Sequence, residues 1–259
     1  MSEKAIFIGA GNVAWHLAHA IDKAGIRVDQ IISKHDETAK ALAQQFGAYF
    51  GTEPVAGSKA DWIFVCTTDE QIEIAAEQLQ FAGGIMLHTS GSIAMEVLHN
   101  KSAHYGVFYP LQSFNKNRQV DFLKVPLLIE ASDVVTENRL KDLAVKLSNT
   151  VLFATSEQRK TIHLAAVVVN NFTNHLFSQA EQIAQQSGLP SSVLYPLMQE
   201  TINKAMALGA HESQTGPAKR GDQAVILTHL TWLKEHLPAF AYEYEIISQS
   251  ILKSHTSTE

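Results

Sequence analysis

Two glycines and an alanine near the start of the chain, Gly9, Gly11 and Ala14, stand at the spacing Gly-x-Gly-x-x-Ala in "IFIGAGNVAWHL". Strand-like residues precede them and a helical pattern follows, and at such a helix N-terminus backbone amides can bind the pyrophosphate of a dinucleotide. A turn that only joins a strand to a helix also favours glycine. The setting favours dinucleotide binding, and the expected contacts are Gly9, Ala10, Gly11, Asn12 and Val13.

The end of the second expected strand, in "IISKHDE", carries Ser33 and Lys34. An acidic residue at this position would bind the ribose hydroxyls of NAD, but Asp29 comes before the core of the strand and Asp36 belongs to the next helix. A hydroxyl followed by a cation suits the 2′-phosphate of NADP. We therefore expect NADP rather than NAD as the cofactor. The alternative is that Lys34 is an ordinary solvated lysine.

Polar residues also follow two later strand-like runs. Thr67 and Thr68 come after "WIFVC", and Ser90 and Gly91 stand in "HTSGS". Loops at the carboxyl ends of parallel strands line the ligand crevice, so we expect the two threonines at the cofactor and Ser90 and Gly91 at the substrate. Thr68 could equally cap the following helix. A serine hydrolase is not indicated, because the sequence Gly-x-Ser-x-Gly does not occur.

Composition narrows the classes of function. The chain has 259 residues and a net charge of −6, and it lacks the clustered Lys/Arg surface that nucleic-acid binding requires. The single cysteine, Cys66, stands in an apolar run and is expected to be a buried strand thiol rather than a nucleophile. We expect no bound metal, no membrane segment and a cytoplasmic location, since "MSEK" leads directly into a strand-like run.

The elements that must position these residues alternate between strands and helices up to Thr155, which predicts βαβ units and a largely parallel sheet. The expected strands are "AIFIGA", "VDQIISK", "AYF", "WIFVCTT", "GIMLHTS", "AHYGVFYP", "VPLLIEAS" and "TVLFATS". Beyond Ser156 the pattern changes to long helices, expected at 157–188, 191–209, 222–235 and 238–255. We therefore place a dinucleotide-binding domain at 1–155 and a helical domain at 156–259.

Several separated stretches together resemble one protein family: "GAGNVA", "ISK", "VCTTD", "HTSGS", "GVFYPLQSF", "HLAAVVVNNFTNHLF" and "TGPAKRGD". The chain resembles NADP oxidoreductases that join a Rossmann-like domain to a helical C-terminal domain of unknown function. These are related to pyrroline-5-carboxylate reductases, deazaflavin-dependent NADP reductases and β-hydroxyacid dehydrogenases. The resemblance implies a doubly wound α/β sheet followed by an all-α domain of the 6-phosphogluconate-dehydrogenase C-terminal type, and a homodimer. It implies no particular substrate.

The chain departs from the β-hydroxyacid dehydrogenases on the first long helix of the second domain. Those enzymes use a lysine and an asparagine four residues apart, and "EQRKTIHLAAVVVNNFTNHLF" has no such pair. His163 and Asn170 share a helical face, with Asn174 one turn further on. A histidine can exchange a proton at neutral pH, so His163 is the candidate acid/base and Asn170 the candidate orienting residue. Alternatively, these groups pack between domains or at a dimer interface.

Two further segments supply candidate substrate contacts. In the resembling family, "TGPAKRGD" lies by the cleft between the domains, so Arg220 could bind a substrate carboxylate; a surface loop is the alternative. Asp222 is expected to be a helix N-cap. In "GVFYPLQSF", Tyr109 follows a strand and could line the cleft or belong to a packed turn. Family members often carry histidine there, which puts a direct proton-transfer role of Tyr109 in doubt.

These observations favour an NADP-dependent oxidoreductase that moves a hydride between nicotinamide and a small oxo or imino compound, or its hydroxy or amino form. The alternative is an NADP-binding sensor or scaffold protein that has lost its chemistry along with the catalytic lysine. A methyltransferase is disfavoured, because Ser33 and Lys34 stand where an acidic residue would contact S-adenosylmethionine.

Overall fold

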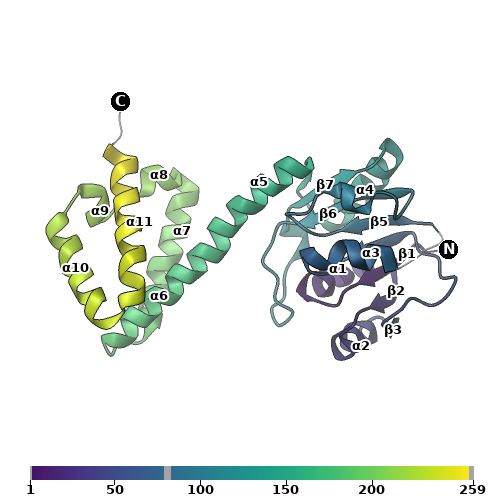
Figure 1. Cartoon of the computed structure of the whole chain (residues 1–259), viewed down its shortest axis with the longest axis horizontal. Coiled ribbons are helices and arrows are strands. Elements are labelled where there is room, and N and C mark those ends of the chain that lie inside the picture. Colours follow the sequence, from purple (N-terminus) through teal and green to yellow (C-terminus); the bar gives the residue numbers. More distant parts are fainter. Residues whose placement is uncertain (1, 79–82, 257–259) are drawn as a thin grey trace. The chain divides into compact units, whose positions relative to one another are not determined.

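The computed structural model describes residues 2–78 and 83–256, and the chain divides into two compact units, residues 1–170 and 171–259 (Figure 1). The first unit contains an eight-stranded sheet in the order β3-β2-β1-β4-β5-β6-β7-β8. All neighbouring strands are parallel except β6 and β7, which are antiparallel. The strands are β1 (Lys4–Ile8), β2 (Arg27–Ile32), β3 (Tyr49–Gly51), β4 (Trp62–Val65), β5 (Ile85–His88), β6 (His104–Pro110), β7 (Leu127–Ala131) and β8 (Val151–Phe153).

Helices cover both faces of this sheet because successive side chains of a strand point to opposite sides. Ala5 and Phe7 of β1 share a core cluster with α1 (Asn12–Lys23), α2 (Asp36–Gln44) and α4 (Val134–Leu147). Ile6 and Ile8 share a second cluster with α3 (Ile72–Gln78). All four residues of β4 and of β5 are buried, as expected for central strands covered on both faces. The predicted doubly wound α/β fold is therefore confirmed.

The helix after the sheet is not regular throughout. It begins as α5 (Ser156–Ala166), passes through a π-helical segment (Val167–Phe172) and continues as α6 (Thr173–Gln186). The sequence predicted one uninterrupted helix over 157–188. The π segment changes the number of residues per turn, so side chains before and after it no longer follow the 3.6-residue period. The division between the two compact units falls within this segment, between Asn170 and Asn171.

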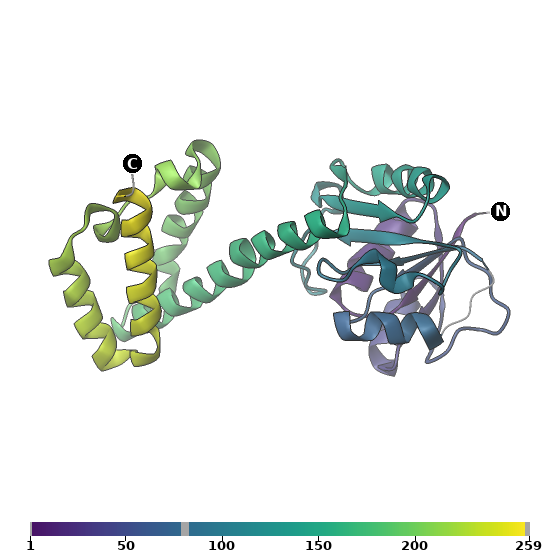
Figure 2. The same ribbon diagram turned by 45° about the horizontal axis from the view of Figure 1, so that its top comes forward.

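The second unit is entirely helical in the part that the structure describes, as predicted. After α6 it comprises a 3₁₀ turn (Ser191–Leu194), α7 (Tyr195–Leu208), α8 (Ala210–Ser213), α9 (Pro217–Arg220), α10 (Gln223–His236) and α11 (Pro238–Thr256). In both ribbon views α10 and α11 run side by side (Figures 1 and 2). Leu233 of α10 and Phe240 and Ala241 of α11 are buried together. Within residues 2–78 and 83–256, no helix is both long and apolar enough to span a membrane.

Candidate functional site

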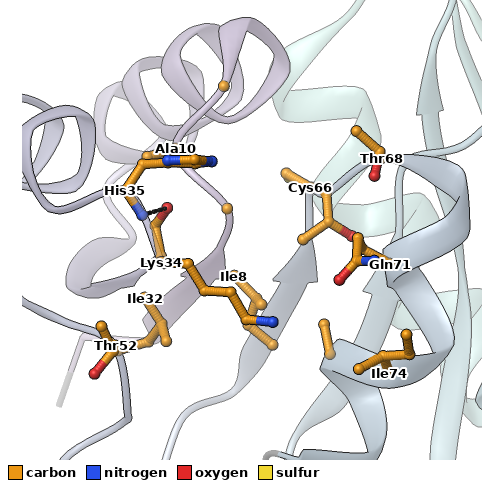
Figure 3. Close-up of a pocket in the computed structure, with 15 residues that line it drawn as sticks. Ile8, Ala10, Ile32, Lys34, His35, Thr52, Cys66, Thr68, Gln71 and Ile74 are labelled. Carbon is orange, nitrogen blue, oxygen red and sulfur yellow. Dashed lines mark hydrogen bonds between the residues drawn. The ribbon is translucent and has the colours of Figure 1, made fainter.

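A cavity of about 380 Å³ opens at the carboxyl ends of β1, β2 and β4. This is the point at which the strand order of a doubly wound sheet reverses, where such folds bind their ligands. In Figure 3, Ala10, Ile32 and His35 lie on one side of the cavity, and Cys66, Thr68, Gln71 and Ile74 lie on the other. The lining residues are Ile8, Gly9, Ala10, Gly11, Ile32, Ser33, Lys34, His35, Thr52, Cys66, Thr67, Thr68, Gln71, Ile74 and Ala75.

The two glycines of the first turn have different structural roles. Gly9 has a φ of +104°, and a Cβ atom there would lie 2.3 Å from the carbonyl oxygen of Cys66, so only glycine allows the turn to pass over β4. Gly11 is the N-cap of α1, and a Cβ atom on it would enter open space. Residues 12–15, the first turn of α1, are uncharged. Backbone amides at the start of a helix attract anions, so this turn is suited to a phosphate group.

Asn12 and Val13 lie beside the cavity without lining it. The side-chain oxygen of Asn12 accepts a hydrogen bond from the backbone amide of Lys116 at 3.1 Å. Val13 packs against the larger core cluster of the sheet. The two side chains therefore hold the start of α1 in place. A contact of these residues with a dinucleotide would come through their backbone amides.

The end of β2 carries the polar residues predicted to distinguish the cofactors. Ser33 and Lys34 both line the cavity, and the Ser33 hydroxyl accepts a hydrogen bond from the backbone amide of His35 at 3.1 Å (Figure 3). Lys34 is exposed. His35 was not predicted from the sequence, although it directly follows the same strand end. Thr52 was missed because it follows β3, a strand of only three residues.

The β4 side of the cavity contributes Cys66, Thr67 and Thr68. Cys66 is buried as predicted, and burial raises the pKa of its thiol to about 12, which keeps it protonated and unreactive. Among the described residues, the buried hydroxyl oxygen of Thr67 has no hydrogen-bond partner. Buried hydroxyls normally have a partner, so this atom is a candidate ligand contact. Gln71, in the 3₁₀ turn Asp69–Gln71, also lines the cavity and was missed.

A second polar cluster joins the ends of β5 and β6 to α5. The Tyr109 hydroxyl lies 2.9 Å from Nδ1 of His163, and the rings meet edge to face. A Cβ atom on Gly91 would lie 2.5 Å from the same nitrogen, so glycine leaves the space for the His163 ring. The Ser90 hydroxyl accepts hydrogen bonds from the backbone amides of Ser92 and Ile93 and thereby shapes the turn.

Arg159, one helical turn before His163, anchors α5 to the sheet. Its side chain is fully buried, pairs with Glu130 of β7 and donates to the backbone carbonyl of Ile93. Glu130 also accepts from the amide and the hydroxyl of Ser156, both at 2.8 Å, at the first residue of α5. Arginine in an amphipathic helix is usually exposed, and for this reason the role of Arg159 was not predicted from the sequence.

Burial controls the protonation of two neighbouring groups. Desolvation, assisted by the positive charge of Arg159, lowers the pKa of His88 to about 3, so His88 is neutral at physiological pH. Burial raises the pKa of Tyr109, and Asp69 acts in the same direction while Arg159 opposes it. Tyr109 therefore keeps its proton and can take part in hydrogen bonds both as donor and as acceptor.

The remaining predicted residues come from the π-helical segment and from the helical unit. Asn170 belongs to the π-helical segment, where the regular period that placed it on the same face as His163 does not hold. Arg220 is an exposed residue of α9 in the helical unit. Asp222 is the N-cap of α10 as predicted, since its carboxylate accepts from the amide of Val225. The described residues contain no group of three His, Cys, Asp or Glu side chains that could hold a metal ion.

Similarity to known proteins shows the class of protein to which this chain belongs. Residues 4–90 match the family model "NADP oxidoreductase coenzyme F420-dependent", and residues 125–251 match "Domain of unknown function (DUF2520)". A Bacteroides fragilis protein with the provisional name NADP oxidoreductase is 41% identical, with a TM-score of 0.90 over 97% of this chain and 98% of that chain. No curated protein matches the sequence.

More distant solved structures share the fold. A 1-pyrroline-5-carboxylate reductase of Streptococcus pyogenes is 14% identical, with a TM-score of 0.63 over 97% of this chain and 99% of that chain. A reductive aminase of Aspergillus terreus in complex with NADPH and ethyl levulinate is 13% identical, with a TM-score of 0.72 over 100% of this chain and 97% of that chain. The fold is thus that of the NAD(P)-dependent oxidoreductases. The chain belongs to the family of NADP oxidoreductases that carry this C-terminal domain of unknown function.

Proposed function

We propose that the protein is an NADP-dependent enzyme that transfers a hydride between nicotinamide and a small oxo or imino compound, or its hydroxy or amino form. The observation that carries the proposal is the cavity at the strand-order reversal, which brings together the glycine turn, Ser33, Lys34 and the buried Thr67 hydroxyl. These residues supply the donors that a dinucleotide phosphate and ribose require.

The cofactor contacts follow from this arrangement. Amides of Gly11, Asn12 and Val13 at the start of α1 would bind the pyrophosphate, and Ser33 and Lys34 would bind the 2′-phosphate. Thr67 and Thr68 would donate to the ribose on the nicotinamide side. The bound NADPH supplies the hydride. NADPH is present in the reductive aminase structure that shares this fold, which supports the same cofactor here.

His163 is the group of this chain that would give or take the accompanying proton. It is half-buried, its Nδ1 is engaged by Tyr109, and it lies against the turn that holds Ser90 and Gly91. An imidazole titrates near neutral pH and suits general acid–base catalysis. We assign orientation of the substrate to Ser90, Gly91 and Asn170, and a carboxylate contact to Arg220.

We also propose that residues 156–259 serve as a substrate and dimerisation domain and that the protein is a homodimer. Large apolar side chains of α7 are exposed, with Leu197 at 65%, Met206 at 76% and Leu208 at 60%. Apolar patches of this kind mark protein interfaces. Met206→Asp should shift the mass measured by light scattering from dimer to monomer, and Val134→Asp, at an exposed valine on α4, should leave it unchanged. A wild-type monomer would refute the dimer.

A panel assay tests the enzyme assignment. NADPH oxidation is followed at saturating cofactor with oxo acids, cyclic imines and a deazaflavin, using wild type and His163→Ala. We expect turnover with at least one of these classes, and a decrease of about a hundredfold or more in the variant, because it lacks the acid/base. Tight NADPH binding without turnover anywhere in the panel would instead favour a sensor or scaffold protein.

A further inference from the structure

The contact between Tyr109 and His163 joins parts of the chain that are 54 residues apart. Tyr109 is 8% exposed and comes from β6, whereas His163 comes from the second turn of α5. The hydroxyl-to-Nδ1 distance is 2.9 Å, and the ring centroids are 5.9 Å apart at 70°. The buried Tyr109 of the sheet thus contacts Nδ1 of His163, a residue that is itself half-buried.

Three features fix the position of the His163 ring. Gly91 leaves room on one side, because a Cβ atom there would lie 2.5 Å from Nδ1 and 2.6 Å from Cγ. The Tyr109 hydroxyl binds Nδ1 on another side. One turn earlier, the buried Arg159 ties α5 to β7 and to the turn after β5. The ring is therefore held by the sheet itself.

The chemistry of a phenol suits both states of the imidazole. A hydroxyl oxygen can accept from Nδ1–H both when the ring is neutral, with Nε2 unprotonated, and when the ring is protonated at both nitrogens. Tyr109 keeps its proton, since burial raises its pKa. The contact can persist while the ring gains or loses a proton at its other nitrogen, Nε2.

We propose that Tyr109 is a positioning residue: its hydroxyl oxygen accepts a hydrogen bond from Nδ1–H of His163, which keeps Nε2 as the atom that exchanges the proton with substrate. This inference rests on the proposed function. In reduction, hydride adds to the substrate carbon, the Nε2–H bond of protonated His163 breaks, and an O–H or N–H bond forms on the substrate. The ring is then neutral, with its Nδ1–H donating to the Tyr109 oxygen.

The chain contains a matched control for this pair. Tyr105, also on β6, lies with its hydroxyl 3.0 Å from Nδ1 of His99, and the two rings are 5.9 Å apart at 72°. This second pair is exposed and lies at the opposite end of the strand from Tyr109. Removing either hydroxyl by substitution with phenylalanine should change only its own histidine.

Nitrogen-15 NMR of the imidazoles in the full chain tests the proposal, with His163→Gln and His99→Gln used to assign the signals. At a pH where the imidazoles are neutral, Tyr109→Phe should move Nδ1 of His163 downfield, because without its acceptor the ring proton shifts in part from Nδ1 to Nε2, and leave His99 unchanged. Tyr105→Phe should do the reverse. An unchanged His163 signal in Tyr109→Phe, or a wild-type neutral ring protonated at Nε2, would overturn the proposal.

A second measurement separates this inference from the proposed function. Tyr109→Phe should leave the Kd for NADPH within about twofold of wild type, because Tyr109 does not line the cofactor cavity. With any substrate found by the panel, kcat should fall about tenfold with little change in KM, and the pH profile of kcat should differ from that of wild type. Failure of wild type to bind NADPH would refute the proposed function and leave the NMR test of Tyr109 valid.

Discussion

At the scale of single residues, the structural roles of Gly91 and His88 depend on contacts with residues far away in the sequence. Gly91 provides space for a histidine from α5, and His88 is a fully buried, neutral imidazole of β5 that is influenced by the charge of Arg159. "HTSGS" was predicted to contact substrate because it ends a strand. The turn does follow the end of β5, as expected. The residues that contact it come from distant segments of the chain, and the position of a residue at a strand end does not predict such contacts.

Replacing Gly91 should disturb the His163 ring without affecting the cofactor turn. In Gly91→Ala the new methyl group would overlap the ring, and we expect a loss of about 1–3 kcal/mol in unfolding free energy. Gly11→Ala is the control, because its Cβ enters open space and its φ is −77°. Urea unfolding measures both variants. Equal stability of Gly91→Ala and wild type would show that the ring is not confined by this glycine.

The pH dependence of stability reports on His88. Its pKa is about 3 in the folded chain and near 6.5 when unfolded, so the unfolded state binds the proton first as the pH falls. The stabilisation is complete above pH 6.5 and decreases between pH 6.5 and pH 3, by about 1.4 kcal/mol per pH unit. His88→Asn should make this slope shallower by that amount.

Tryptophan fluorescence in a Trp232→Phe background measures this slope for the sheet unit, since Trp15 and Trp62 are then the only tryptophans in the chain. Urea unfolding at pH 7 and pH 5 gives the two stabilities. Identical slopes for the parent and for His88→Asn would show that His88 does not cause the acid sensitivity.

At the scale of secondary-structure elements, α5 carries the candidate acid/base, and its attachment determines where His163 lies. The eight expected strand stretches correspond to β1–β8, because buried parallel strands give continuous apolar runs that stand out in sequence. The π segment could not be predicted in this way, since "VVVNNF" fits a regular helix equally well. The buried Glu130–Arg159 ion pair could not be predicted either, because charged side chains are usually exposed to solvent.

Breaking this ion pair should lower the free energy of unfolding and increase the hydrogen exchange of α5. Arg159→Met leaves Glu130 without its partner, and removal of one partner of a buried pair costs about 3–5 kcal/mol. Lys160→Met, next in sequence, removes only an exposed pair with Glu157 and should cost less than about 1 kcal/mol. Chemical unfolding and hydrogen exchange of α5 check both variants. Similar losses in the two would contradict the anchoring role of Arg159.

At the scale of the whole molecule, the sheet unit is built so that three strand ends meet at one cavity. The sequence pattern of the glycine turn and of the strand ends indicated seven residues that line it: Gly9, Ala10, Gly11, Ser33, Lys34, Thr67 and Thr68. It did not predict that the side chains of Asn12 and Val13 pack elsewhere, because their orientation depends on the loop around Lys116 and on the core. The family comparison and the fold agree on an NAD(P)-dependent oxidoreductase of unassigned substrate.

Calorimetric titration with NADPH and NADH tests the central claim most directly, using wild type, Lys34→Glu and the charge-matched control Lys40→Glu on the exposed side of α2. Wild type should bind NADPH more tightly than NADH. Lys34→Glu should weaken NADPH binding by about ten- to a hundredfold and NADH binding far less, because a charge-assisted hydrogen bond to the 2′-phosphate is lost. Lys40→Glu should change neither affinity appreciably. Equal losses for the two cofactors in Lys34→Glu, or no binding of either by wild type, would contradict the account.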